Sequence, residues 1–396
     1  MSIRGKRSIG LLLLPLLLSA CTPPMPPEFK AELAERYVTC VPGEVTVSSV
    51  PELTDVAQIW IDGLSENCSD MTTSLIDPDV DVDVKPDIFI TAAGQTPACT
   101  VAASSPIGLD AVAIAVSVEG LDGVIFTPAL LHRALSGGMT SWADAELQEL
   151  NSEIELTDTP VVIRASTQPQ DIAALNEWMS RIDPVGWPAI PSGLISDAAF
   201  DAEATTVDLE TEGTIAVVPA SLVTNYSLQS ISIQTATEAE PVFATVESVI
   251  SAGTQMVATS EGSILTASLD PSLPPIPAAG NDVASLPWQA LNQFTITVCS
   301  GENEMAARAF ARYALRLDSQ GAFTSVGFTE LPEQIRVAGV EAVSQGLPEP
   351  TIPPSGAPEE TTSEEPTEEP TEDSTDLPSE EPIEEVTDEA TPEPTS

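Results

Sequence analysis

Few residues of this chain could act as a nucleophile or as a general base near neutral pH. The sequence has one histidine, His132, and no nucleophile-elbow or phosphate-loop motif. Enzymes of most classes need an activated nucleophile, or a base whose pKa lies near the working pH. Pairs of carboxylates are uninformative here, because the chain has 61 Asp and Glu residues. We therefore expect a protein that binds rather than an enzyme, with no cofactor.

The five cysteines divide into one near the N-terminus and four in the main part of the chain. An even number of cysteines outside the cytoplasm favours disulfides, and four cysteines allow three pairings. We expect Cys68 to pair with Cys99, and Cys40 with Cys299, which would tie the chain's entry into the domain to its return. A metal site is a poor alternative, because there is one histidine and no two cysteines have ligand spacing.

The N-terminal residues have the pattern of an export signal. Three basic residues precede an apolar run from Ile9 to Leu18, which is too short to span a bilayer. The run ends in Leu18-Ser19-Ala20-Cys21, which resembles the lipobox of bacterial lipoproteins. The resemblance implies a signal peptide at 1–20, a lipid on the Cys21 sulfur and a linker over 21–39. The protein would then be lipid-anchored at the cell membrane, on its extracytoplasmic face. The alternative is ordinary secretion with a nearby cleavage site.

The last segment, residues 348–396, is rich in Pro, Glu, Thr and Ser. It contains 17 acidic residues, no basic residue and no aromatic residue. Such a composition cannot bury enough apolar surface to offset the entropy of ordering. We expect a disordered acidic tail. We favour a passive solubilising tail; a wall-layer spacer, a cation-attracting brush and a docking tail for another protein are the alternatives.

The charge of the remaining chain excludes nucleic acid as a partner. Of the 61 acidic residues, 44 lie before the tail, against ten Lys and Arg residues after Cys21. A nucleic-acid-binding protein needs a basic surface, and none is plausible here. The long-range field would also oppose the approach of an anionic ligand.

Strand and helix patterns alternate between the linker and the tail. Apolar strand patterns occur at 43–50, 87–91, 111–118, 160–164, 214–218 and 293–298, and helical patterns at 51–64, 127–136, 170–182 and 304–317. Strands that alternate with helices over this length predict α/β lobes with largely parallel sheets. The helix at 127–136 has the clearest boundaries, with Thr127 as N-cap, Pro128 at the first position and Gly137 just past the end.

Several of these segments resemble, in order and spacing, the phosphate-binding proteins of ABC importers. The matching pieces are Gly123–Asp144, Leu150-Asn151, Thr159–Arg164, Gly213–Val218, Glu304–Leu317, Ser319–Gly321, Gly327-Phe328 and Leu331-Pro332. The resemblance covers most of residues 43–335. It implies a type II periplasmic-binding-protein fold over 40–340, with two α/β lobes and a ligand cleft between them. Lobe 1 would comprise about 40–106 and 225–340, and lobe 2 about 107–224.

The phosphate site of that family is only partly present. The family has an Arg followed by a glycine- and hydroxyl-rich stretch that surrounds the anion. Here Arg164 is present, but both glycines are absent, Pro169 removes an amide donor and Asp171 adds a negative charge. The resemblance therefore carries over only Arg164, with Ser48 and Ser49 after the first strand. An ion pair for Arg164, and helix capping by the two serines, are the structural alternatives.

The sequence thus predicts a lipid-anchored solute-binding protein of the importer type, whose ligand need not be phosphate. Its partners would be a small molecule, which could be an anion, and an ABC permease. Contact with the membrane would be through the lipid alone. The alternative is a degenerate binding domain that acts as a surface interaction or regulatory module, with the acidic tail as its contact.

Overall fold

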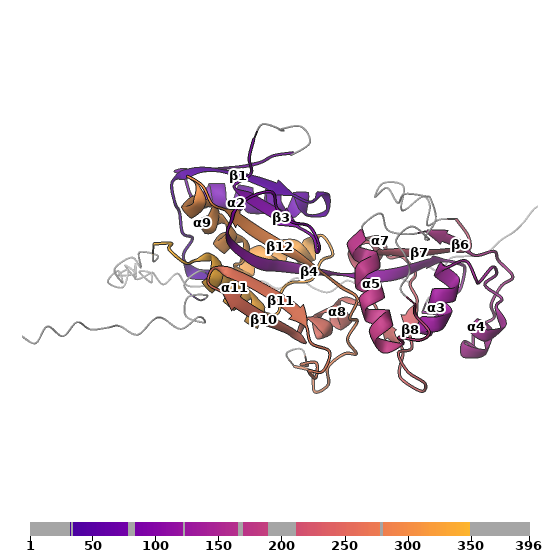
Figure 1. The fold of residues 1–396 in the computed structure, drawn as a ribbon. Coiled ribbons are helices and arrows are strands. Elements are labelled where there is room, and N and C mark those ends of the chain that lie inside the picture. The colour runs from indigo at the N-terminus through magenta and orange to yellow at the C-terminus, as the bar shows by residue number, and fades with distance from the viewer. Residues whose placement is uncertain are drawn as a thin grey trace, which may run out of the picture. The chain divides into compact units, whose positions relative to one another are not determined.

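The computed structural model describes residues 32, 35–77, 84–121, 123–164, 169–188, 211–277 and 280–348 (Figure 1). The expected signal peptide, Cys21 and the acidic tail lie outside these residues. The strands are β1 (Gly43–Ser49), β2 (Met71–Leu75), β3 (Ile88–Thr91), β4 (Val101–Ser117), β5 (Ile125–Phe126), β6 (Val162–Arg164), β7 (Thr214–Pro219), β8 (Ser232–Ile233), β9 (Val242–Phe243), β10 (Met256–Glu261), β11 (Ile264–Leu269) and β12 (Leu291–Cys299). The helices are η1 (Pro51–Leu53), α2 (Thr54–Asn67), α3 (Pro128–Leu135), α4 (Ala145–Leu150), α5 (Pro169–Ile182), α7 (Ala220–Tyr226), α8 (Val246–Gly253), α9 (Glu304–Ala314), α10 (Leu317–Ser325) and α11 (Glu333–Val343).

The strands form one large mixed sheet and one small sheet. The large sheet has the order β10-β11-β4-β12-β3-β1-β2, and β7 pairs with both β4 and β6. The small sheet has the order β5-β8-β9. The expected α/β class is confirmed, but the expectation of largely parallel sheets was wrong. Strand β12 runs antiparallel to both β3 and β4, and β7 runs antiparallel to β4, because the chain re-enters the sheet from the opposite end.

Strand β4 is the element that both halves of the fold share. Its first part pairs with β12, from Val101 to Ala111, and its last part pairs with β7, from Val112 to Ser117 (Figure 1). The sequence pattern predicted only the apolar end of this strand. The first part was not recognised because serines, a proline and an aspartate interrupt its apolar residues.

Two hydrophobic cores lie along β4. The first contains β4 up to Leu109, together with β1, β3, β12 and the helices α2, α9, α10 and α11. The second contains β4 from Ala111 onward, together with β7, α3 and α5. It also takes in side chains beyond the expected lobe boundary near residue 224, namely Ile231, Ile233, Val242, Val249, Trp288 and Ala290. Two α/β bodies, joined by β4 and by a returning chain, are the arrangement that the periplasmic-binding fold implies.

The expected disulfide pairing was wrong. Cys40 bonds to Cys68, with 5.4 Å between their Cα atoms, and Cys99 bonds to Cys299, with 5.8 Å. Strand pairing explains both bonds. Cys40 and Cys68 each lie three residues before a strand, and these strands, β1 and β2, are parallel with Gly43 beside Met71. Cys299 ends β12 and lies opposite Val101 of the antiparallel β4, which brings it beside Cys99.

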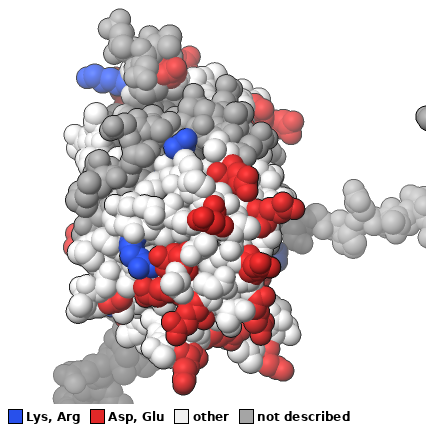
Figure 2. Space-filling view, turned by 90° about the vertical axis from the view of Figure 1, so that its right-hand side faces the viewer, with Lys and Arg blue, Asp and Glu red and all other residues white. Residues whose placement is uncertain are grey.

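Acidic side chains dominate part of the molecular surface. Figure 2 shows a face on which Asp and Glu far outnumber Lys and Arg among the described residues. The α4 region contributes exposed carboxylates at Glu146, Glu149, Glu153, Glu155 and Asp158. Arg133 forms ion pairs there with Asp144 at 2.6 Å and with Glu146 at 3.3 Å. A surface of this kind keeps the protein soluble and repels anions at long range.

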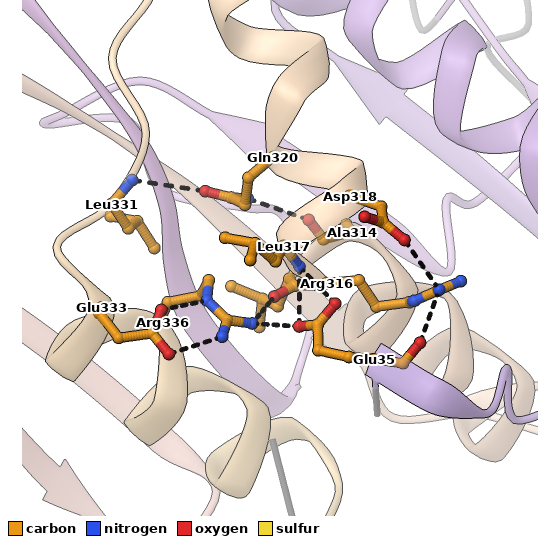
Figure 3. A network of polar contacts seen from close by, with 10 residues as sticks. Glu35, Ala314, Arg316, Leu317, Asp318, Gln320, Leu331, Glu333 and Arg336 are labelled. Atoms are coloured by element: carbon orange, nitrogen blue, oxygen red, sulfur yellow. Dashed lines mark hydrogen bonds and ion pairs between the residues drawn. The ribbon is translucent and has the colours of Figure 1, made fainter. Parts of the chain in front are cut away.

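The side chain of Glu35 links the segment before β1 to helices α10 and α11 of the first core through hydrogen bonds and an ion pair (Figure 3). Its carboxylate accepts the backbone N–H of Leu317 at the start of α10, at 2.7 and 2.8 Å, and pairs with Arg336 at 2.5 Å. Arg336 also donates to the Leu315 carbonyl at 2.9 Å and pairs with Glu333 at 2.7 Å. Burial alone would lower the pKa of Arg336, but Glu333 and Glu35 raise it overall. The chain therefore enters the domain at a fixed point.

Candidate functional site

Strands from the two halves of the fold end on either side of one short stretch of β4, and both run toward that stretch. In the first half, the strand register relates the end of β1 to a position on β4. Ser49 at the end of β1 pairs with Ile90 of β3. Ile90 pairs with Ile296 of β12, and Ile296 pairs with Ser105 of β4. Because β1 runs parallel to β4, the chain leaves β1 in the direction of Asp110. Ligands of α/β proteins bind beyond the carboxyl ends of strands.

The second half approaches the same stretch from the opposite direction. Arg164 at the end of β6 lies level with Ala216 of β7, which lies level with Ala115 of β4. Strand β6 runs antiparallel to β4, so the chain leaves β6 toward Asp110 as well. Strand β7 ends opposite Val112, and α7 begins there. We call the stretch Asp110–Val112 the junction, because the first core ends at Leu109 and the second begins at Ala111.

Four buried polar residues gather at the junction, and we call them the junction cluster. They are Asp110 on β4, Asp171 in the first turn of α5, Ser221 in the first turn of α7, and Asn292 on β12. Their residues are only 2–6% exposed. Asp110 accepts hydrogen bonds from the Ala111 N–H at 2.7 Å, the Ser221 N–H at 3.1 Å and the Ser221 hydroxyl at 2.8 Å. The Asn292 Nδ2 donates to Asp171 Oδ1 at 2.5 Å.

The two carboxylates of the cluster occupy positions that favour negative charge. The first turn of a helix presents unpaired N–H groups and the positive end of the helix dipole, and bound anions are often found there. Asp110 takes the N–H of Ser221 at the start of α7. Asp171 belongs to the first turn of α5. Both carboxylates are therefore placed where the start of a helix stabilises negative charge.

Burial changes the proton affinity of Asp110. Loss of solvent raises its pKa from 3.8 to about 7, and the negative charge of Asp171 adds to the effect. The hydrogen bonds from Ala111 and Ser221 act in the opposite direction, because they stabilise the ionised form. At neutral pH the group is thus present in both its protonated and its ionised form.

The predicted ligand residues are not brought into this cluster by any contact among the described residues. Arg164 Nη1 donates to the carbonyl of Ile163 at 3.2 Å, and its buried Nε has no hydrogen-bond partner among the residues that the structure describes. No ion pair to Arg164 occurs in the described part of the chain. The residues that follow it, 165–168, lie outside the described residues. A ligand role for Arg164 stays a prediction.

Ser48 and Ser49 lie at the end of β1, on the first-core side of the junction. Ser48 is buried, and the Ser49 hydroxyl donates to the Val50 carbonyl at 3.1 Å. Neither serine caps the helices that follow, since η1 and α2 have no side-chain cap. Their role as ligand donors stays a prediction.

The sequence pattern indicated Asp171 but not Asp110, Ser221 or Asn292. A signal for Asp110 was present, because it is the single charged residue between Val101 and Val118. A charge inside an apolar strand is rarely tolerated without hydrogen-bond partners. Those partners come from residues more than one hundred positions away, so only the folded chain identifies them.

Among the described residues, no group of three or more His, Cys, Asp or Glu side chains could hold a metal ion. No helix in the same part of the chain is long and apolar enough to cross a membrane. Trp142 and Trp178 are buried and pack in the second core. His132 packs edge-on against Trp187, with 5.5 Å between ring centroids.

No protein-family model matches the sequence, and no curated protein is significantly similar to it. Solved structures with some likeness are described as phosphate-binding proteins. A candidate phosphate ABC transporter substrate-binding protein from Clostridium perfringens, with bound phosphate, is 12% identical, with a TM-score of 0.47 over 73% of this chain and 100% of its own. An ABC-type phosphate transport receptor from Vibrio cholerae is 10% identical, with a TM-score of 0.43 over 73% and 100%. A human phosphate-binding apolipoprotein is 11% identical, with a TM-score of 0.49 over 74% and 93%. All three TM-scores lie below 0.5, so nothing about the ligand of this chain follows from them.

Proposed function

We propose that this protein is an extracytoplasmic, lipid-anchored binding protein that takes a small ligand at the junction of its two cores. One observation carries the proposal: strand ends and helix starts from both halves converge on the junction cluster. Sites between two α/β bodies are common places for small ligands. The two bodies would be lobes, about 40–106 with 225–340 and about 107–224, and they would close around the ligand by a hinge motion. Side chains between Ile231 and Val249, with Trp288 and Ala290, would belong to the second lobe, because they pack in its core.

The chemistry of the cluster favours a ligand that donates hydrogen bonds. Asp110 and Asp171 offer carboxyl oxygens, and the side-chain oxygen of Asn292 is buried without a hydrogen-bond partner among the described residues. Inorganic phosphate offers mostly acceptor oxygens and negative charge, which these carboxylates repel. A neutral polyol or a cationic amine offers several N–H or O–H donors. We infer that the ligand belongs to this second class and that phosphate is excluded.

Ser48 and Ser49 would contact the ligand from one strand end as the lobes close. Arg164 would contact it from the other where the ligand is a polyol, whose hydroxyl oxygens accept hydrogen bonds; a cationic amine offers Arg164 no acceptor. The lipid on Cys21 would be the one attachment to the membrane, and the linker 21–39 would carry the domain outward. In an importer, the closed form would be presented to an ABC permease. Genes for a permease and an ATPase beside the gene of this protein would support that role.

Calorimetric titration of the purified chain tests the proposal, with inorganic phosphate, putrescine and glucose as the three probes. We expect no binding of phosphate, and binding of at least one donor-rich probe. The Asp171→Asn variant should lose that binding, whereas Glu177→Gln should keep it, because Glu177 is an exposed residue on the same helix. Phosphate affinity in the micromolar range or tighter would overturn the proposed ligand class.

A second function is favoured by the near-complete burial of the cluster. Asp171 is 2% exposed and is bonded to Asn292, so the described site is filled by its own side chains. A domain of this kind, closed without a ligand, would serve as a surface interaction or regulatory module, with the acidic tail as its contact. Absence of binding for every small-molecule probe, together with signalling genes beside this gene, would favour the module.

A further inference from the structure

Four of the ten Lys and Arg residues that follow Cys21 gather on the last helices of the first core. Arg308 and Arg312 are about one turn apart on α9, Arg316 comes directly before α10, and Arg336 is on α11. Arg336 donates to the carbonyl of Leu315, the residue next to Arg316. The region is therefore a local concentration of positive charge within a strongly acidic protein.

Arg308 shows how a buried arginine is accommodated in this region. The residue is 6% exposed. Its guanidinium donates to Glu304 at 3.0 Å, to the Ala102 carbonyl at 2.8 Å and to the Val343 carbonyl at 3.4 Å. Buried charges are tolerated when they are paired and hydrogen-bonded in this way. Arg308 therefore needs no further partner.

Arg312 is buried to the same degree but has no such partners. It is also 6% exposed, and its Nε is buried without an acceptor. No hydrogen bond or ion pair to its guanidinium occurs within the described residues. The C-terminal end of α9 favours a cation through the helix dipole, but a dipole does not replace the missing acceptors. Buried donors without an acceptor are rare and costly, and more so on a charged group.

The next arginine along the chain adds to this need. Arg316 Nη2 donates to the Glu35 carbonyl at 2.8 Å and lies 3.4 Å from the carboxylate of Asp318, which is 83% exposed (Figure 3). Its Nε is buried and finds no acceptor in the described part of the chain. Burial, and then the positive charge of Arg316, lower the pKa of Arg312. The two guanidinium groups are thus near enough to repel one another, and a negative charge beside them would offset that repulsion.

We propose that Arg312 and Arg316 form a binding site for a small monovalent anion, of which chloride is the simplest. The anion accepts hydrogen bonds from the guanidinium N–H groups that lack an acceptor in the described chain. Access to Arg312 is narrow at 6% exposure, so a small ion is favoured over a bulky one. The acidic surface beyond about 8 Å is screened at physiological salt, so the two nearby cations decide the local field. The site uses no residue of the junction cluster and is independent of the ligand proposed there.

The anion would act where the N-terminal segment docks on the domain. Arg316 holds the Glu35 carbonyl, and the Glu35 carboxylate accepts the Leu317 N–H at 2.7 Å. Repulsion from Arg312 opposes the position of Arg316 in this contact. An anion between the two arginines would offset the repulsion and stabilise the docked segment.

Urea unfolding of the full chain, in sodium chloride and in sodium gluconate at equal ionic strength, tests the site. Gluconate is a bulky anion that keeps the screening constant. With a dissociation constant of about 10 mM, a rise from zero to about 100 mM chloride should lower the unfolding equilibrium constant of the wild type about tenfold. Arg312→Gln should show no such dependence on chloride. Equal stability of the wild type in the two salts would overturn the proposal.

Arg36→Gln is the matched control, because it also removes one cation, but one that is 65% exposed and pairs with Glu32 at the surface. It should keep the chloride dependence of the wild type. The same dependence in Arg312→Gln would show that chloride acts elsewhere and would refute the site. If Arg312→Gln does not fold, Arg312→Lys keeps the charge but loses the planar set of donors, and it should need about tenfold more chloride for the same effect. An unchanged chloride midpoint in Arg312→Lys would refute the site as well.

Discussion

The buried carboxyl of Asp110 makes the stability of the protein depend on pH in an unusual direction. Most carboxylates in folded proteins have lowered pKa values and stabilise the fold as the pH rises. Burial raises the pKa of Asp110 from 3.8 to about 7. Between these values the folded chain therefore binds a proton that the unfolded chain has lost. The free energy of unfolding must then fall as the pH rises from about 4 to about 7, and the contribution is flat above that range.

The size of the effect follows from the two proton affinities. Each pKa unit corresponds to about 1.4 kcal/mol, and integration from about pH 5 to about pH 8 gives a loss of about 3 kcal/mol. Asp110→Asn has the same size and cannot titrate. Its amide oxygen can still accept from the Ser221 N–H. Over the same interval, the stability of the variant relative to the wild type should therefore rise by about 3 kcal/mol.

Urea unfolding at the two pH values, followed by tryptophan fluorescence, measures this difference. Carboxylates that do not interact with Asp110 contribute equally to both proteins, so their effect cancels in the comparison. Glu177→Gln is the control, because it removes an exposed carboxylate from α5 and should keep the pH dependence of the wild type. If Asp110→Asn and the wild type lose stability in parallel, Asp110 is ionised in the fold and the reasoning from burial is refuted.

Three further predictions concern the anchor, the ligand and the disulfides. Cys21→Ser should release the protein from the membrane into the medium, as shown by cell fractionation; retention at the membrane would contradict the lipid anchor. Arg164→Ala should abolish binding of a probe found by calorimetry and leave the thermal midpoint nearly unchanged, whereas a lowered midpoint with intact binding would mark a structural role. Replacing Cys40 and Cys68 together by Ser should lower the free energy of unfolding by about 3 kcal/mol, since the bond closes a loop with a sequence separation of 28. Unfolding in urea measures that loss, and unchanged stability would contradict it.

The sequence was most informative where local chemistry decides the structure. Helix α3 begins and ends as expected, because the Thr127 hydroxyl accepts from the Leu130 N–H and Gly137 adopts a φ of +79° just past the end. The helix expected at 304–317 is divided, since α9 ends at Ala314 and α10 begins at Leu317. Nothing in the apolar spacing signals that turn, which is stabilised by the docking of Glu35 on the Leu317 N–H.

Features that depend on the pairing of distant strands could not be predicted from local sequence patterns. The disulfide partners follow from which strands lie side by side: Cys40 and Cys68 precede parallel neighbours, and Cys299 ends a strand antiparallel to the one after Cys99. Local patterns contain no information about register between distant strands. The antiparallel course of β12 was overlooked for the same reason.

The junction cluster shows why a polar residue in an apolar strand is informative even without its partners. An apolar side chain at position 110 would continue the packing from Leu109 to Ala111 and would avoid the loss of hydration that a carboxyl suffers there. Stability therefore gives no reason for an ionisable group at this position. Its hydrogen bonds reach the first turn of α7, and Asn292, which lies opposite it on β12, reaches the first turn of α5. The position of this carboxyl, where both cores meet, is the reason for placing the proposed ligand site at the junction.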